Sequence, residues 1–237
     1  MTRARSVSGR IILALDTVEV ARARALAAAA APHFGMIKLG LEFFLANGQD
    51  GYRDVAGPIP RPVFLDLKLH DIPTTVGGAV RAVLPLAPRL ITLHAAGGAA
   101  MIDAARLAAE EAGADRPLLL AVTVLTSLRA ADLAATGVSG GTTQQVLRLG
   151  RLALAAGADG LVCSPHEVAP LRSALGAGPA LVVPGIRPNG AAAADQARTM
   201  TPREAVDAGA DWLVIGRPIT AAADPAAAAA AIAASLA

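Results

Sequence analysis

The sequence predicts one (β/α)8 barrel, the TIM barrel of the α/β class, over residues 1–237. Eight short aliphatic runs alternate along the chain with Ala-rich stretches of helical character, which is the order of a parallel sheet wrapped by helices. Each run is nearly continuous in apolar residues, as expected for strands that are covered on both faces. No composition break or linker divides the chain, and its length is that of a single barrel.

The eight runs are the expected strands, and a helical stretch follows each of them. In chain order the strands are Arg10–Asp16, Met36–Gly40, Pro62–Lys68, Arg89–His94, Pro117–Leu125, Gly160–Ser164, Ala180–Pro184 and Trp212–Gly216. The helices are expected at 18–31, from 41 onward with glycine breaks, at 73–86, 99–111 and 142–156, from about 165, after 201, and over the C-terminal stretch.

The connections between these elements also follow from the residues. Gly-Ala-Asp occurs at 157–159 and again at 209–211, directly before the sixth and eighth strands, where it predicts a helix stop and a turn into the strand. A polar turn is expected between the fifth strand and the helix at 142–156. The loop from the seventh strand to about Thr201 is unusually long for a barrel connection.

The charge pattern argues against a nucleic-acid partner. The formal net charge is only +2, the arginines are scattered, and no basic run is interleaved with aromatic residues. Cys163 is the single cysteine, so an intrachain disulfide is excluded, which suits a reducing compartment. No apolar stretch has the length of a membrane span. The sequence therefore predicts a cytoplasmic protein without a nucleic-acid or membrane partner.

Lysine is nearly absent from the chain. Lys38 and Lys68 are the only lysines among 21 basic residues, and the other 19 are arginines. The abundance of Ala, Arg and Gly suggests a coding bias that turns interchangeable lysines into arginines. A position that stays lysine is then expected to need a compact ammonium that can release a proton, which arginine cannot do in a protein. The alternative is the chance survival of two surface lysines.

Polar residues gather where the expected strands end, which is where barrels of this kind carry their active sites. Asp16 ends the first strand, Lys38 lies in the second, and Asp66 and Lys68 end the third, with Asp71 in the loop beyond. Asp66 and Lys68 are two apart, so both should point into the barrel mouth. Such alternating charges can stabilise a developing carbanion, and an ammonium can then protonate it. The alternative is a salt bridge that only holds the barrel together.

The ends of the last two strands predict a phosphate site. Gly216 permits close backbone approach, and Arg217 can contact phosphate oxygens in a bidentate manner. The long loop after the seventh strand suits a lid that orders over a ligand, with Arg187 and Gln196 as anchors. The alternative for this loop is an insertion without a role in binding.

Six segments, taken in order along the chain, resemble the orotidine 5′-monophosphate decarboxylase family. They are LALD, KLG, DLKLHDIPTTV, TVLTS, PGIRP followed by DQART, and VIGRPIT. DLKLHDIP is highly specific, whereas many phosphate-binding barrels share the GRP ending. The segments extend from the first strand to the start of the last helix, and the resemblance implies a homodimeric enzyme that decarboxylates orotidine 5′-monophosphate.

The resemblance also implies a role for each matching residue. Lys68 would protonate C6 after carbon dioxide leaves, within a charge network that includes Lys38, Asp66 and Asp71. The other implied roles are Asp16 and Lys38 at the ribose hydroxyls, Asp71 and Thr75 reaching in from the partner subunit, Thr126 at the pyrimidine ring, and Arg187, Gln196, Gly216 and Arg217 at the 5′-phosphate. Thr74 stands where many members carry Asn, a change that is not expected to abolish activity.

No metal or organic cofactor is expected. The four histidines are scattered, Cys163 stands alone, and neither a GxGxxG nor a P-loop pattern is present. His94 is interpreted as a barrel-mouth histidine rather than a catalyst. One rival is a Mg²⁺-dependent relative, a 3-keto-gulonate-phosphate decarboxylase or hexulose-phosphate synthase; Lys38 and the Ile-Pro-Thr-Thr at 72–75 argue against it. A second rival is a non-catalytic barrel that binds a phosphate ligand.

Overall fold

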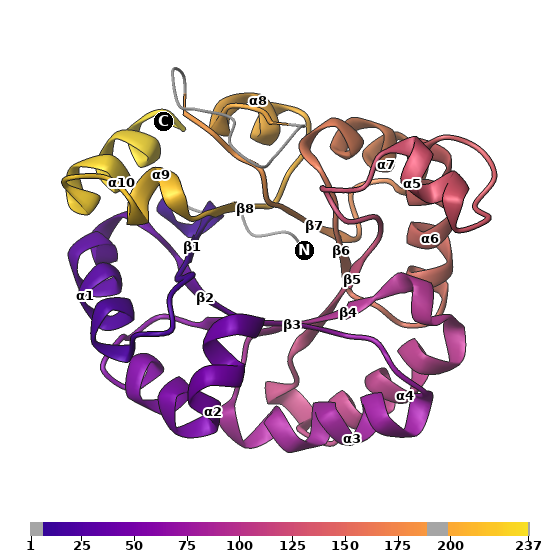
Figure 1. Ribbon diagram of the computed structural model, residues 1–237, viewed down its shortest axis with the longest axis horizontal. Coiled ribbons are helices and arrows are strands. Elements are labelled where there is room, and N and C mark those ends of the chain that lie inside the picture. Colours follow the sequence, from indigo (N-terminus) through magenta and orange to yellow (C-terminus); the bar gives the residue numbers. More distant parts are fainter. Residues whose placement is uncertain (1–6, 189–198, 237) are drawn as a thin grey trace.

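Eight parallel strands form a closed barrel in the computed structural model, which describes residues 7–188 and 199–236. Neighbours in sequence are neighbours in the sheet, and β8 closes on β1. Viewed down the barrel, the strands make a ring that the helices surround (Figure 1). The strands are β1 (Ile11–Ala14), β2 (Met36–Gly40), β3 (Val63–Leu69), β4 (Leu90–His94), β5 (Leu118–Val122), β6 (Gly160–Val162), β7 (Ala180–Val183) and β8 (Trp212–Ile215).

The helices follow the strands in the order that the sequence predicts. They are α1 (Val20–Ala30), α2 (Leu41–Ala56), α3 (Pro73–Val83), α4 (Ala99–Glu110), α5 (Ala130–Ala135), α6 (Thr142–Ala155), α7 (Val168–Leu175), α8 (Pro202–Asp207), α9 (Arg217–Thr220) and α10 (Pro225–Ala234). None of the helices in the described ranges is both long enough and apolar enough to cross a bilayer.

The prediction was wrong in two places and imprecise at the strand ends. Residues 126–141 are not only a polar turn, because α5 forms there, with Asp132 accepting a hydrogen bond from the Arg129 amide at its start. The last helical stretch is two helices, α9 and α10, rather than one. Several predicted strands ended too late, at Asp16, Ser164 and similar residues, because the pairing with the neighbouring strand ends at Ala14 in β1 and at Val162 in β6.

Two apolar layers build the core on either side of the sheet. Residues that alternate along the strands point into the barrel, for example Ile12 and Ala14 on β1 and Phe64 on β3. Their neighbours, such as Ile11 and Leu13, pack outward beneath the helices. Burying each of the larger side chains, such as isoleucine, leucine or phenylalanine, contributes about 1.5–3 kcal/mol. Burial on both faces explains why the strand sequences are continuously apolar.

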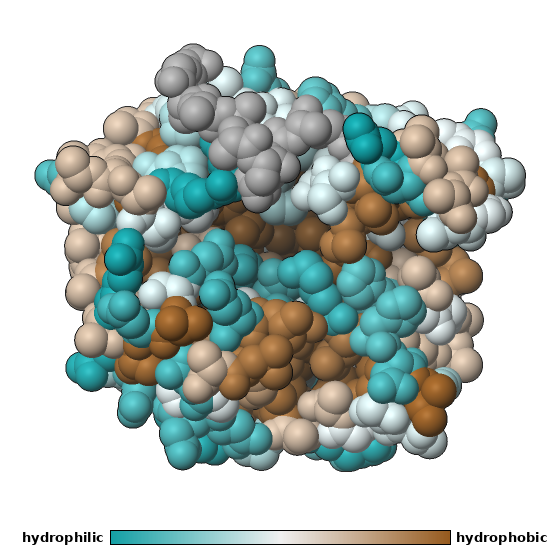
Figure 2. Space-filling view, viewed as in Figure 1, coloured by the Kyte–Doolittle hydropathy of each residue, from teal (hydrophilic) through white to brown (hydrophobic). Residues whose placement is uncertain are grey.

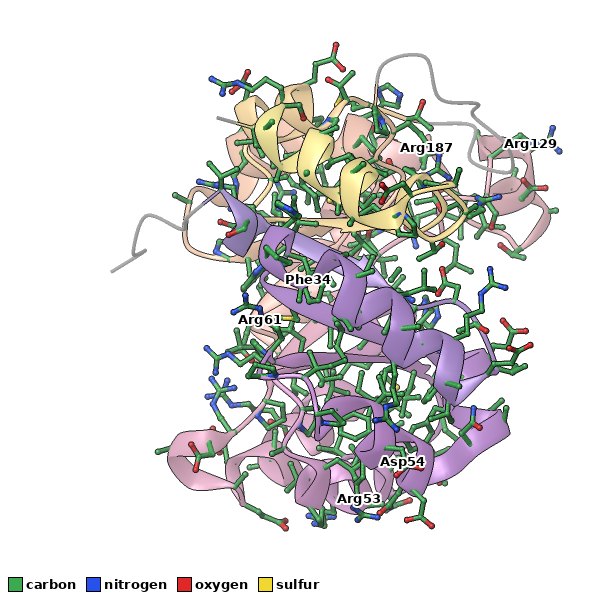
Figure 3. The ribbon with its side chains drawn as sticks, turned by 90° about the vertical axis from the view of Figure 1, so that its left-hand side faces the viewer. Phe34, Arg53, Asp54, Arg61, Arg129 and Arg187 are labelled. Atoms are coloured by element: carbon green, nitrogen blue, oxygen red, sulfur yellow. The ribbon has the colours of Figure 1, made fainter. Side chains whose placement is uncertain are left out.

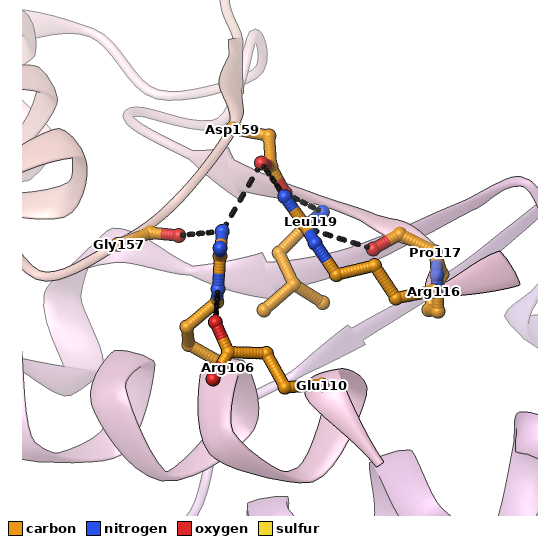
Figure 4. Close-up of polar contacts among 7 residues, drawn as sticks. All are labelled: Arg106, Glu110, Arg116, Pro117, Leu119, Gly157 and Asp159. Atoms are coloured by element: carbon orange, nitrogen blue, oxygen red, sulfur yellow. Dashed lines mark hydrogen bonds and ion pairs between the residues drawn. The ribbon is translucent and has the colours of Figure 1, made fainter. Parts of the chain in front are cut away.

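The first Gly-Ala-Asp segment closes the barrel at the end where the strands begin. Gly157 has φ +97°, which ends the preceding helix, and the Asp159 amide donates to the carbonyl of Leu119 at 2.9 Å. The Asp159 carboxylate accepts from the Leu119 amide at 2.8 Å and from both Nη atoms of Arg116 at 2.9 and 2.7 Å, while Arg106 adds a contact at 3.3 Å (Figure 4). Asp159 therefore fastens the start of β6 to the start of β5.

The second Gly-Ala-Asp segment repeats this arrangement between β7 and β8. Gly209 has φ +110°, and the Asp211 amide donates to the carbonyl of Leu181 at 3.0 Å. The Asp211 carboxylate accepts from the Leu181 amide at 2.8 Å and from the Arg172 guanidinium. The predicted helix stop and turn is confirmed at both positions.

Candidate active site

A cavity of about 230 Å³ opens among the carboxyl ends of the strands. Figure 2 shows a hollow near the middle of the face in view, with hydrophilic side chains along one side of it. The cavity is lined by Ala14, Asp16, Lys38, Phe64, Asp66, Lys68, Thr126, Val162, Pro184, Gly185, Arg187, Val214, Gly216 and Arg217. These residues come from widely separated parts of the chain and meet because the barrel brings its strand ends together.

Four charged side chains form a continuous chain of alternating sign along one wall of this cavity. The Lys38 Nζ atom lies 3.1 Å from Oδ1 of Asp16 and 3.5 Å from Oδ2 of Asp66. The Lys68 Nζ atom lies 2.8 Å from the same Oδ2 atom of Asp66. Lys38 and Asp66 are buried, whereas the side chains of Lys68 and Asp16 are 35% and 57% exposed. The alternative that the two lysines are surface residues left by chance is therefore excluded. Asp16 and Lys68, at the two ends of the row of charges, face the open cavity.

Opposite charges decide the ionisation of the two buried members. Burial by itself would lower the pKa of Lys38, but the attraction of Asp66 and Asp16 outweighs it and raises that pKa above the ordinary value. Burial would likewise raise the pKa of Asp66, but Lys38 and Lys68, together with hydrogen bonds from Lys68 and Thr92, lower it. Both pKa shifts favour the charged forms, so the centre of the cluster is the carboxylate of Asp66 beside the ammonium group of Lys38.

The end of β3 is not the regular strand that the sequence predicts. Leu65 pairs with Ile91, but the next pairing joins Leu69 to Leu93, so β3 advances four residues while β4 advances two. Within this bulge Lys68 has φ +50°, a left-handed conformation that costs a residue other than glycine about 1–3 kcal/mol. The expectation that Asp66 and Lys68 point into the same mouth holds, but through a bulge instead of simple alternation.

The hydroxyl of Thr92 on β4 spans this bulge. It accepts a hydrogen bond from the Lys68 amide at 2.9 Å and donates one to Oδ1 of Asp66 at 2.8 Å. Thr92 is fully buried. Sequence reasoning missed this residue, although a hydroxyl in the otherwise apolar run LITLH, two positions before His94, was a signal for a polar contact inside the barrel.

Two glycines make room for the charged chain. A Cβ atom at Gly40 would lie 3.1 Å from Nζ of Lys38, and one at Gly216 would lie 3.3 Å from Oδ2 of Asp16. Both distances are tighter than ordinary carbon contacts, so a side chain at either position would displace a charged group. Gly216 was predicted to allow close backbone approach to a ligand, and in the structure it also allows close approach of Asp16.

The residues predicted to hold phosphate lie around the same cavity. Arg187 is buried, its amide donates to the carbonyl of Met200 at 2.9 Å, and its Nη1 atom donates to the carbonyl of Ile186. Figure 3 shows Arg187 toward one end of the barrel and Arg61, which precedes β3, toward the other. Arg217 begins α9 directly after Gly216. The two arginines thus face the cavity from β7 and β8, and Thr126 lines it after β5.

Two predicted site residues are not part of this cavity in the single chain. Asp71 and Thr75 are exposed and absent from its lining, and the Asp71 carboxylate accepts a hydrogen bond from the Ile72 amide. In the described part of the chain no ion pair joins Asp71 to Lys38 or Lys68. Gln196 lies outside the described residues.

His94 lies beside the charged chain without lining the cavity. Its ring stacks on that of His70, with ring centroids 5.2 Å apart. Burial lowers the pKa of His94, and the nearby His70 and Lys68 lower it further against the opposing effect of Asp66. The lowered pKa favours the neutral imidazole of His94, which agrees with the interpretation of His94 as a residue of the barrel mouth.

Known proteins match this chain over nearly its whole length. The family model described as "Orotidine 5′-phosphate decarboxylase / HUMPS family" matches residues 9–232. The chain is 57% identical over 229 residues to the orotidine 5′-phosphate decarboxylase of Anaeromyxobacter dehalogenans (strain 2CP-1 / ATCC BAA-258), covering 97% of this chain and 99% of the relative. It is 55% identical over 226 residues to the enzyme of that name from Gluconobacter oxydans (strain 621H), covering 94% and 95%.

The same likeness holds in three dimensions. The crystal structure of orotidine 5′-phosphate decarboxylase from Lactobacillus acidophilus superposes with a TM-score of 0.84 at 36% sequence identity, covering 96% of this chain and 99% of that one. The resemblance carried by the six sequence segments is confirmed, and the chain belongs to the orotidine 5′-phosphate decarboxylase / HUMPS family.

Proposed function

We propose that the protein decarboxylates orotidine 5′-monophosphate to uridine 5′-monophosphate, the last step in making that nucleotide de novo. The observation that carries the proposal is the chain Asp16–Lys38–Asp66–Lys68, in which a buried carboxylate lies between two ammonium groups at the edge of a cavity. Relatives that are more than half identical over almost the full length bear the name of this activity.

The chemistry follows from the positions of the charges. Breaking the bond between C6 and the substrate carboxylate releases carbon dioxide and leaves an electron pair on C6. An ammonium fixed beside that carbon stabilises the developing negative charge, and it needs no reorganisation when the bond breaks. Lys68, the more exposed of the two lysines, then donates a proton to C6 and is re-protonated from water. Lys38 and Asp66 keep the field around the carbon fixed.

The remaining predicted residues bind the rest of the nucleotide in this proposal. Asp16 and Lys38 hold the ribose hydroxyls, and Thr126 contacts the pyrimidine ring. Arg187, Gly216 and Arg217 bind the 5′-phosphate, with Gln196 from the loop beyond Arg187. Binding the phosphate far from C6 supplies energy that closes the site around the reacting carbon.

We also propose that the protein is a homodimer in which Asp71 and Thr75 complete the site of the partner subunit. Asp71 lies in the loop between β3 and α3 and Thr75 in the first turn of α3, and both are exposed and outside the cavity of their own subunit. An exposed aspartate two residues beyond the end of the active-site strand is suitably placed to cross a two-fold interface. The single cysteine supports a cytoplasmic location.

The test is turnover by the purified protein after treatment with EDTA, followed by the loss of ultraviolet absorbance of orotidine 5′-monophosphate. The expected result is turnover that EDTA does not reduce. Turnover that EDTA abolishes and Mg²⁺ restores would contradict the proposed cofactor-free mechanism. Binding of the nucleotide without turnover would favour the non-catalytic barrel.

A further inference from the structure

We propose that Thr92 is a positioning residue of the active site, which fixes the direction of the Lys68 ammonium by holding the Lys68 backbone and the Asp66 carboxylate together. The proposal rests on the proposed decarboxylase function for its kinetic consequences. Its structural basis is one hydroxyl with two defined partners, both on the bulge of β3.

The hydrogen-bonding capacity of this hydroxyl is well matched to its two partners. A threonine hydroxyl has one proton to donate and can accept through its lone pairs. The proton goes to Oδ1 of Asp66 at 2.8 Å, and a lone pair takes the amide of Lys68 at 2.9 Å. With Oδ1 occupied in this way, Oδ2 of Asp66 is turned toward Lys68 and Lys38.

The backbone of Lys68 depends on this contact. Lys68 lies in the bulge, where the pairing of β3 with β4 is interrupted between Leu65 and Leu69, and its amide donates to the Thr92 hydroxyl. The only other residue besides glycine with positive φ in the described ranges is Ala87, which ends a short helical turn, a common place for that conformation. Lys68 has no such local reason, so its left-handed conformation needs a tertiary support.

The burial of Thr92 strengthens the inference. Thr92 shares the inner face of β4 with Leu90 and His94, and its side chain has no access to solvent. A valine has nearly the same shape and avoids the cost of burying a hydroxyl. A hydroxyl at this position is therefore best explained by the two groups that it binds, one of them charged.

The experiment compares Thr92→Val, Thr92→Ser and a matched control, Thr123→Val. Thr123 is a second buried threonine of the barrel whose hydroxyl donates to the backbone carbonyl of Val162. For Thr92→Val we expect kcat to fall roughly 10- to 100-fold, because a hydrogen bond to a charged group is lost and its partner stays buried. Affinity for uridine 5′-monophosphate should stay close to that of the unmodified protein. Thr92→Ser should recover most of kcat, and Thr123→Val should retain it.

Two further readouts separate positioning from simple packing. The acid limb of the kcat/KM profile should move to higher pH in Thr92→Val, because a hydrogen bond that favours the Asp66 carboxylate is gone. A crystal structure of Thr92→Val should show that Lys68 has left the positive φ region or that its Nζ atom has moved away from Asp66.

The results that would overturn the role of Thr92 differ from those that would overturn the proposed function. A Thr92→Val variant with unchanged kcat and an unchanged Lys68 conformation would overturn the inference. Equal losses in Thr92→Val and Thr92→Ser, with weakened nucleotide binding and a lower Tm, would overturn it in favour of packing. If the unmodified protein had no turnover, the proposed function would fail, and the crystal structure of the variant would still decide whether Thr92 positions Lys68.

Discussion

Lys38 and Lys68 direct their ammonium groups at the same carboxylate oxygen, Oδ2 of Asp66, at 3.5 and 2.8 Å. Asp16 binds Lys38 at 3.1 Å, so the four charges balance, and the ammonium group of Lys68 is the positive end of the series at the open cavity. An ammonium in this position suits a reaction in which negative charge develops on a bound substrate. The two lysines are expected to have unequal roles, because Lys38 is buried and Lys68 is partly open to the cavity.

Replacing Lys68 should separate binding from chemistry. Lys68→Ala is expected to reduce kcat by at least about 10²- to 10⁴-fold, since the general acid is lost. Affinity for uridine 5′-monophosphate, measured by calorimetry, should be largely retained because the phosphate contacts remain. Lys68→Arg should not rescue turnover, because a guanidinium does not release its proton in a protein. An arginine variant with near-normal turnover would refute the role of a proton-donating ammonium.

Mixing inactive subunits tests whether Asp71 crosses the interface. Asp71→Asn and Lys68→Ala are each expected to be nearly inactive as pure proteins. If Asp71 completes the partner's site, a heterodimer has one doubly altered site and one intact site, so a random equal mixture should regain about a quarter of the normal activity. If Asp71 acts within its own subunit, both sites of the heterodimer stay defective. Absence of recovered activity, with heterodimers verified by mass spectrometry, would therefore refute the shared site.

Adding one methyl group at Gly40 should disturb the charged chain without unfolding the barrel. The new Cβ atom would lie 3.1 Å from Nζ of Lys38, and a lysine end can move aside more easily than backbone can. We expect Gly40→Ala to lower kcat/KM by roughly 10- to 100-fold through misplacement of the ammonium, while Tm changes little. Gly178→Ala is the control, because a Cβ there meets nothing within 4 Å. Equal kinetics in both variants would contradict the close packing at Gly40.

Asp159, with its partners Arg106, Arg116 and the Leu119 amide, is expected to contribute to stability and not to catalysis. Burial would raise the pKa of Asp159, but hydrogen bonds from Arg116 and the Leu119 amide, with the charges of Arg116 and Arg106, lower it. The pKa of Asp159 is lower in the folded protein than in the unfolded chain. The charged carboxylate therefore stabilises the fold above the unfolded-state pKa of about 4. This stabilisation is lost as the pH falls toward the folded-state pKa. Asp159→Asn should thus lower the free energy of unfolding at pH 7 by about 1–3 kcal/mol, with the difference shrinking in acid.

Urea denaturation at several pH values measures this effect. Asp207→Asn is the control, because Asp207 forms an exposed ion pair with Arg203 one helical turn away, and such pairs contribute less than about 1 kcal/mol. Equal destabilisation by both variants, or a difference that does not depend on pH, would contradict the role given to Asp159.

The sequence was sufficient to predict the barrel and most of the cavity lining. The order of the apolar runs places the residues that follow them at one mouth, and the cavity is lined by the predicted residues Asp16, Lys38, Asp66, Lys68, Thr126, Arg187, Gly216 and Arg217. Gly157 and Gly209 could be recognised as helix stops, because Gly-Ala-Asp is a local signal that needs no tertiary information.

What escaped prediction depends on contacts between distant segments. The bulge at Lys68 arises from the pairing of β3 with β4 and from one hydroxyl on β4, and neither is visible in the local pattern DLKLHD. Helix α5 was missed because six residues with two alanine pairs give too short a pattern to distinguish from a turn. The proposed contact of Asp71 with a second subunit rests on the resemblance, because the periodicity of one chain carries no signal for it.

The two Gly-Ala-Asp segments, at 157–159 and 209–211, have a consequence for which loops of the barrel can be replaced. They fasten β5 to β6 and β7 to β8 at the rim opposite the cavity, so closure of the barrel there does not involve the residues that line the cavity. Loops at the open rim can therefore be exchanged, lengthened or redesigned for new substrates while the far rim keeps the strands in register.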